Sequence, residues 1–400
     1  MSELFERPRF YRDVTFHKHT DRTVGFLELF YDLVYVATLI QIGNFLSDNL
    51  TMLGFGKFMV LLFVVWWAWT GETTFQNRYV VDDVTHRFLV LLQMCGVAAM
   101  GLSVNGAFDE LSVQFALSFV LVRALLAVMW LRVYRSHPES RGLSVGYLIG
   151  FVGGIAIWLV SIALPEDNRW IAWLVAIVFE ILFFGKPSIM VHTREWAPDD
   201  HHFIERFGIF TIIVLGEAFV KVLDDAQGTS LGVDQVLSGV TLLVLLFAVW
   251  WIHFSDGADE IYDLQAPIKP FAWVYGHLFL AASLVMYGVA AKKLFGESIK
   301  YADKAVTEEY RLLLTAAVIG FLIAQALINF GLDDSLTAQN QSRKVALYLG
   351  AAVVLGAFGL LATGVTGIVL TGVVAVAMVA LVGDGIVQTK RADAATPAAH

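Results

Sequence analysis

The sequence predicts an all-α, polytopic membrane protein of about 12 transmembrane helices. Of its 400 residues, 58% are hydrophobic and 16% are charged, whereas soluble globular domains have about 25% charged residues. Apolar runs of about 20 residues, the length that a helix needs to cross the hydrocarbon core, recur along the whole chain. Both observations are typical of a chain embedded in a lipid bilayer.

The apolar runs are separated by polar or glycine-containing connections. The expected spans cover residues 24–46, 57–75, 86–104, 112–133, 144–164, 170–190, 203–223, 233–254, 270–292, 309–331, 345–363 and 365–387. The short break at 364–367 makes the last boundary the least defined. Residues 1–23 are polar and have no signal-peptide pattern, and the small polar residues of 388–400 predict a disordered tail.

The connections also indicate how the chain is oriented. With both termini in the cytoplasm, most Lys and Arg residues of the connections fall on the cytoplasmic side, as the positive-inside rule requires. The connection from Lys292 to Arg311 is the exception, and its mixed charges fit an amphipathic surface helix. We therefore expect both the N-terminus and the C-terminus to lie in the cytoplasm.

Two motifs occur twice, which predicts two parallel six-helix repeats over 24–190 and 203–387. FVVWWAW at 63–69 resembles FAVWWIH at 247–253, and FLELF at 26–30 resembles FIERF at 203–207. Each match pairs a first-half span with the span six later. Many transporters are built from such repeats and bind their substrate between them.

The first span contains two carboxylates where a membrane helix normally has none. Glu28, Asp32 and Tyr35 are spaced so that they share one helix face. A charged side chain at the bilayer centre costs roughly 2.5–3.5 kcal/mol. The pair therefore either holds a proton or cation, or Asp32 is ion-paired with a basic residue that locks two helices together.

Two further spans have isolated polar residues. Asn77 ends a polar face of the second span and precedes a charged cluster, which fits a gate or a solvated helix end. Arg123 stands in the middle of the fourth span and needs a carboxylate partner at that depth, for which Glu180 and Asp32 are the candidates. An anionic substrate bound by Arg123 is the alternative.

The seventh and eighth spans complete the set of candidate residues. Glu205 and Arg206 are adjacent near the start of the seventh span, and Glu217 follows Gly216, where a bare backbone permits close helix approach. His253 in the eighth span is the side chain best suited to change its charge near neutral pH. We expect these residues to bind a substrate or ion together with those of the first spans.

Three separated motifs resemble the bacterial low temperature requirement protein A family. They are ELFYDLVYV at 28–36, WAWTGETTFQNRYVVDDVTHR at 67–87 and HFIERFGIFTIIVLGEAF at 202–219. The resemblance covers about residues 20 to 387 and implies a multi-spanning protein of the bacterial inner membrane, linked by name to growth in the cold, with no defined molecular activity. It carries the family's signature residues over to Glu28, Asp32, Glu205, Arg206 and Glu217. Other members often have Phe where this chain has Tyr31 and Tyr35.

Other motifs are weak or missing. Gly142, Gly146, Gly150 and Gly154 form a ridge that predicts a close helix crossing on the fifth span. A histidine-rich and acidic segment at 192–202 matches no metal signature, and we expect neither a metal site nor a cofactor. The lack of a Walker A sequence, HExxH or a nucleophile elbow argues against ATP-driven pumping by this chain and against common hydrolases. With one cysteine, Cys95, an intrachain disulfide is excluded.

Three functions remain open. A proton- or cation-coupled secondary transporter of a small solute accounts for charges that recur in both halves. A membrane stress or scaffold protein would neutralise every buried charge in pairs. An intramembrane enzyme acting on lipid would group its acids at one leaflet. The net charge of -9 without a basic run argues against nucleic acid as a partner, and the sequence leaves a homo-oligomer open.

Overall fold

A computed structural model gives the architecture of residues 10–11, 14–16, 23–224, 232–255, 268–332 and 338–395. The described part of the chain consists of α-helices and one two-stranded sheet in which β1 (Thr15–Phe16) pairs antiparallel with β2 (Tyr79–Val80). It forms two compact units, residues 1–210 and 211–400, and the boundary between them falls inside α8 (Asp200–Asp224).

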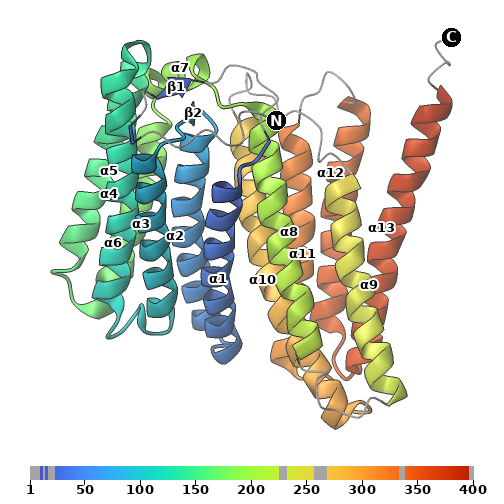
Figure 1. Ribbon diagram of the computed structural model, residues 1–400. Coiled ribbons are helices and arrows are strands. Elements are labelled where there is room, and N and C mark those ends of the chain that lie inside the picture. Colours follow the sequence, from blue (N-terminus) through green and yellow to red (C-terminus); the bar gives the residue numbers. More distant parts are fainter. Residues whose placement is uncertain are drawn as a thin grey trace. The chain divides into compact units, whose positions relative to one another are not determined.

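The first unit is built from helices that run alongside one another (Figure 1). These helices are α1 (Phe26–Asp48), α2 (Met52–Gln76), α3 (Val84–Ser103), α4 (Ser112–Ser136), α5 (Arg141–Ser161), α6 (Glu166–Phe184) and α7 (Pro187–Glu195), followed by the first half of α8. α1 packs on α2 and α3, and α3, α4, α5 and α6 pack in chain order. β1, β2 and α7 lie at one end of this unit (Figure 1).

The second unit contains the remaining half of α8 and five long helices. They are α9 (Val233–Ser255), α10 (Lys269–Tyr301), α11 (Glu308–Gly331), α12 (Ala338–Leu361) and α13 (Gly367–Ala395). α10 packs on α11, α11 on α12, and α13 on α9. Gly364 has a φ of 85° in the turn between α12 and α13, a backbone conformation that favours glycine, which confirms the helix break predicted at 364–367.

Ten of the described helices are long and apolar enough to cross a bilayer, and α6 and α7 together give an eleventh if they form one broken span. α8 is as long as α2 but contains Glu205, Arg206 and Glu217. The chain is therefore an all-α, multi-pass membrane protein.

The structure corrects three expected boundaries. The single span predicted at 170–190 is broken, because α6 ends at Phe184 and α7 begins at Pro187 with a bend of 66°. The break falls before Pro187 because proline is favoured at the first position of a helix and disfavoured inside one. α10 continues to Tyr301 instead of ending near 292. α13 continues to Ala395, so residues 388–395 of the predicted disordered tail are helical.

The glycine ridge of α5 confirms the predicted close helix crossing. A Cβ atom at Gly150 would lie 2.4 Å from the Phe184 ring of α6, and one at Gly142 would lie 2.7 Å from the His192 ring of α7. Glycine is thus required where α5 meets the broken pair α6 and α7. The same ridge determines where Glu180 of α6 lies, because Gly154 stands directly against its carboxylate.

Candidate functional site

The carboxylates of α1 lie inside the first unit. Glu28 is 4% exposed and Asp32 is fully buried. Glu28 sits in the first turn of α1, where its Oε2 accepts a hydrogen bond from the Gly25 backbone N–H at 2.7 Å; the free N–H groups of a helix N-terminus favour a negative charge there. One turn further, Asp32 Oδ1 accepts a hydrogen bond from Trp69 Nε1 of α2 at 2.8 Å.

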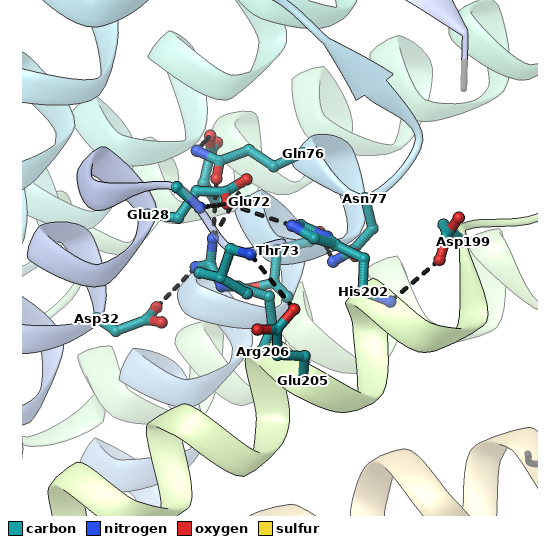
Figure 2. A network of polar contacts seen from close by, with 12 residues as sticks. Glu28, Asp32, Glu72, Thr73, Gln76, Asn77, Asp199, His202, Glu205 and Arg206 are labelled. Atoms are coloured by element: carbon teal, nitrogen blue, oxygen red, sulfur yellow. Dashed lines mark hydrogen bonds and ion pairs between the residues drawn. The ribbon is translucent and has the colours of Figure 1, made fainter. Parts of the chain in front are cut away.

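Arg206 joins three helices around these acids, as Figure 2 shows. Its fully buried guanidinium donates from Nη2 to Asp32 Oδ1 at 2.6 Å and from Nη1 to Gln76 Oε1 of α2 at 2.9 Å. Nη1 also lies 3.7 Å from Glu28 Oε1. The Arg206 guanidinium therefore links the first half of α8 to both α1 and α2.

Glu72 of α2 is a third carboxylate of this cluster. It is fully buried, and its Oε1 accepts a hydrogen bond from Gln76 Nε2 at 2.8 Å. Within the described ranges, Glu72 Oε2 and Asp32 Oδ2 have no hydrogen-bond donor. Gln76 therefore lies between two charged groups, accepting from Arg206 and donating to Glu72.

His202 of α8 connects Glu28 with the end of α2. Its Nε2 lies 3.3 Å from Glu28 Oε2, and its Nδ1 is hydrogen-bonded to Asn77 Oδ1. Its own backbone N–H donates to Asp199 Oδ1 at 3.0 Å, which caps the first turn of α8. Asn77 in turn donates to the Thr73 carbonyl at 2.7 Å, so the predicted polar face of the second span ends in this network.

The segment at 192–202 has structural contacts of its own. His192 lies 3.5 Å from Glu195 in α7, while His202 faces Asn77 and Glu28 in the cluster. Over the part of the chain that the structure describes, no three His, Cys, Asp or Glu side chains are arranged to hold a metal ion.

Arg123 belongs to a separate ion pair. Its Nη2 donates to Glu180 Oε2 at 2.7 Å, with both side chains buried, which confirms the predicted pairing with Glu180 and not with Asp32. Trp67 Nε1 donates to the same Glu180 oxygen at 2.6 Å. A Cβ atom at Gly71 would lie 2.4 Å from Arg123 Nη1, so Arg123 rests against the α2 backbone next to Glu72.

Of the predicted site residues, the structure brings Glu28, Asp32, Asn77, Glu205 and Arg206 together. Glu205 is exposed, and its Oε2 accepts a hydrogen bond from the Val24 backbone at 3.3 Å, just before α1 begins. Tyr35 is buried on α1, and its hydroxyl lies 3.1 Å from that of Tyr31.

The two remaining candidates lie in the second unit. Glu217 is half-buried, and a Cβ atom at Gly216 would have no described heavy atom within 4 Å, so the expected close helix approach is not formed there. His253 is buried, with its Nδ1 3.2 Å from Gln325 Nε2 of α11 and its ring centroid 5.6 Å from that of His277.

Sequence reasoning missed Glu72, Gln76 and Trp69, and did not connect His202 with the acids. The signal was present for Glu72, because it is the one carboxylate between residues 52 and 76 of an otherwise apolar span. Gln76 lies one turn beyond it on the same face. The role of Trp69 could not be predicted, because its partner Asp32 is on another helix.

The cluster has an excess of carboxylates at its buried centre. Asp32 and Glu72 are both fully buried, and Arg206 is the guanidinium beside them. An uncompensated charge in such a place is strongly unfavourable, so a buried carboxylate takes up a proton or is matched by a cation. The arrangement is therefore chemically able to bind and release a proton or a small cation.

Two comparisons place the chain among known proteins. The family model described as bacterial low temperature requirement A protein matches residues 23–383. A protein of Rhizobium meliloti that is named an uncharacterized protein is 26% identical over 287 residues, which cover 68% of this chain and 70% of that relative.

Proposed function

The chain belongs to the bacterial low temperature requirement A family, and from this premise we propose that it is a proton- or cation-coupled secondary transporter of a small solute. The coupling centre is the cluster of Asp32, Glu72 and Arg206 in the first unit, and Glu28 with His202 connects it to the start of α1 and α8. The chain acts in the bacterial inner membrane and needs no cofactor of its own.

Glu72 is the observation on which the proposal depends. Its hydrogen-bond donor among the described residues is the neutral amide of Gln76, with the neutral Gln93 amide beside it, whereas Asp32, Asp83 and Glu180 are each paired with an arginine. A purely structural protein is not expected to keep a fully buried carboxylate that has no basic group bonded to it among the described residues, because an apolar side chain of similar size would be more stable there. A carrier needs one buried group that gains and loses charge during each cycle.

The packing supports a carrier with twelve spans in two repeats. Counting α8 and the broken pair of α6 and α7 as spans, each span predicted from the sequence coincides with a helix. In the first half α4 packs on both α3 and α5, and in the second half α11 packs on both α10 and α12. In the same way, α2 contacts α6 in the first half and α9 contacts α13 in the second. These equivalences have the six-span offset of the repeated FVVWWAW motif, which pairs α2 with α9.

Both termini are cytoplasmic in this proposal. The support is the excess of Lys and Arg in the connections on that side, which includes Arg132, Arg135 and Arg141 after the fourth span. The end of the first unit that carries β1, β2 and α7 is then the cytoplasmic end (Figure 1).

The test is proton flux through the purified protein in lipid vesicles, measured with an internal pH dye across a panel of cations and small solutes. We expect solute-dependent proton flux in the wild type, and its loss in Glu72→Gln and Asp32→Asn. Glu309→Gln is the matched control, because it removes an exposed carboxylate at the start of α11.

Two outcomes would contradict the proposal. One is that folded wild-type protein gives no flux with any solute, and the other is that flux is unchanged in Glu72→Gln. Either result would favour the static scaffold, which the arginine–carboxylate pairs elsewhere in the first unit also fit. An enzyme acting on lipid is less well supported, because Asp32 and Glu72 are enclosed by protein and not open to the bilayer.

A further inference from the structure

Gln76 makes two hydrogen bonds that depend on which way its amide points. Its Oε1 accepts from Arg206 Nη1 at 2.9 Å, and its Nε2 donates to Glu72 Oε1 at 2.8 Å. An amide has one acceptor end and one donor end. This orientation suits an ionised Glu72, whose two oxygens both accept hydrogen bonds, and it suits a guanidinium, which only donates them.

Protonation of Glu72 at Oε1 changes which end of the Gln76 amide must face it. A protonated carboxyl group has an O–H that must donate, and a buried O–H without an acceptor costs about 1–3 kcal/mol. Two side-chain amides lie at Glu72, those of Gln93 and Gln76, and Gln76 is the one that is bonded to Oε1. A proton on Oε1 can be accepted by Gln76 once that amide turns over. Its carbonyl then faces Glu72 and its NH2 group faces Arg206, where two donors oppose each other.

A second acceptor lies close enough for the Arg206 guanidinium to reach it by a small movement of its side chain. Its Nη1 lies 3.7 Å from Glu28 Oε1, while Nη2 stays on Asp32 Oδ1 at 2.6 Å. The guanidinium can therefore exchange Gln76 for Glu28 without losing Asp32. That exchange breaks the hydrogen bond between α8 and α2 and strengthens the attachment of α8 to α1.

We propose that Gln76 is a positioning residue that transmits the protonation of Glu72 to Arg206 by reversing its amide, so that Arg206 moves from Gln76 to Glu28. This inference rests on the proposed function, and it explains how one proton could alter the attachment of α8. The proton comes from water and is held by the Glu72 carboxyl group, and no other covalent bond changes.

The test uses infrared difference spectroscopy on the full-length protein in lipid vesicles, with the proton as the probe. A change in pH is expected to produce the carbonyl band of a protonated carboxyl group, and Glu72→Gln assigns this band to Glu72 by removing it. In the wild type we expect a shift of the arginine guanidinium bands to appear together with the Glu72 band. Arg206→Lys assigns that shift to Arg206 by removing it.

Gln76→Met is the decisive variant, because methionine keeps the length and helical preference of glutamine without its amide. We expect it to retain the Glu72 band and to lose the guanidinium shift. Gln76→Asn, whose shorter amide cannot span both partners, provides the same test if Gln76→Met folds poorly. Gln325→Met is the control, since it removes another buried amide, bonded to His253, and should retain both signals.

The experiment distinguishes failure of the role proposed for Gln76 from failure of proton binding at Glu72. A guanidinium shift that persists at full size in Gln76→Met and Gln76→Asn would overturn the role of Gln76 and leave the proposed function standing. A wild-type protein with no Glu72 carboxyl band at any pH would overturn proton binding at Glu72, and with it this inference.

Discussion

Arg206 Nη2 and Asp32 Oδ1 lie 2.6 Å apart, although the two residues are separated by 174 positions in the sequence. Both side chains are fully buried. This ion pair links the first half of α8 to α1, the helix that contains the motif ELFYDLVYV.

We expect Arg206→Met to lower the free energy of unfolding by about 3–5 kcal/mol, because it leaves the Asp32 carboxylate buried without its cation. The double variant Asp32→Asn with Arg206→Met removes both charges and keeps an acceptor for Trp69, so it should be clearly more stable than Arg206→Met alone. Denaturant unfolding in detergent measures both values. Equal or greater loss in the double variant would show that Asp32 does not depend on Arg206.

Gly154 gives the second prediction, because a Cβ atom there would lie 2.2 Å from Glu180 Oε1. We expect Gly154→Ala to displace Glu180 from Arg123 and to destabilise the protein by about 1–3 kcal/mol, the usual range for overpacking. The control is Gly383→Ala in α13, where a Cβ atom would meet no atom of the described residues within 4 Å. If both alanine variants have the same unfolding midpoint, Glu180 does not need the space at Gly154.

The sequence predicted the helices well and the site only in part, and there is a physical reason for the difference. Long apolar runs report directly on spanning helices, so α1 to α5 and α9 to α13 follow from hydropathy. The break at Gly185 was missed because a hydropathy window averages over Pro187.

For the site, isolated charges were informative because each needs a partner at its depth. Arg123 was correctly assigned to Glu180 on this basis. The sequence does not state which helices are neighbours, however, and for that reason Arg206, Gln76 and Glu72 could not be joined into one network. Gly216 also proved a poor indicator of a close helix approach, since a Cβ atom there would meet no described heavy atom within 4 Å.

Asp83 has two roles that two variants can separate. Its Oδ1 accepts from the His86 backbone N–H at 2.6 Å and caps α3, and its Oδ2 lies 2.5 Å from Arg132 Nη2. Asp83→Asn keeps a good helix cap but removes the charge, whereas Asp83→Ala removes both. We expect Asp83→Ala to be less stable than Asp83→Asn by about 1 kcal/mol, the usual contribution of a cap, in thermal unfolding. Equal stabilities would mean that the cap contributes nothing beyond the ion pair.

The hydroxyls of Tyr31 and Tyr35 lead to the last prediction. They lie 3.1 Å apart on buried side chains of α1, and the rings are 4.9 Å apart. Tyr31→Phe or Tyr35→Phe alone leaves one buried hydroxyl without the other, which should cost about 1–3 kcal/mol. The double Phe variant removes both polar groups and keeps the ring contact, so we expect it to be more stable than either single variant. This non-additivity, measured by unfolding in detergent, would explain how the first motif tolerates Phe at both positions, as the resemblance to other family members implies. Additive losses would instead show that each hydroxyl is needed independently, which would assign them separate partners in the Asp32 and Glu72 cluster.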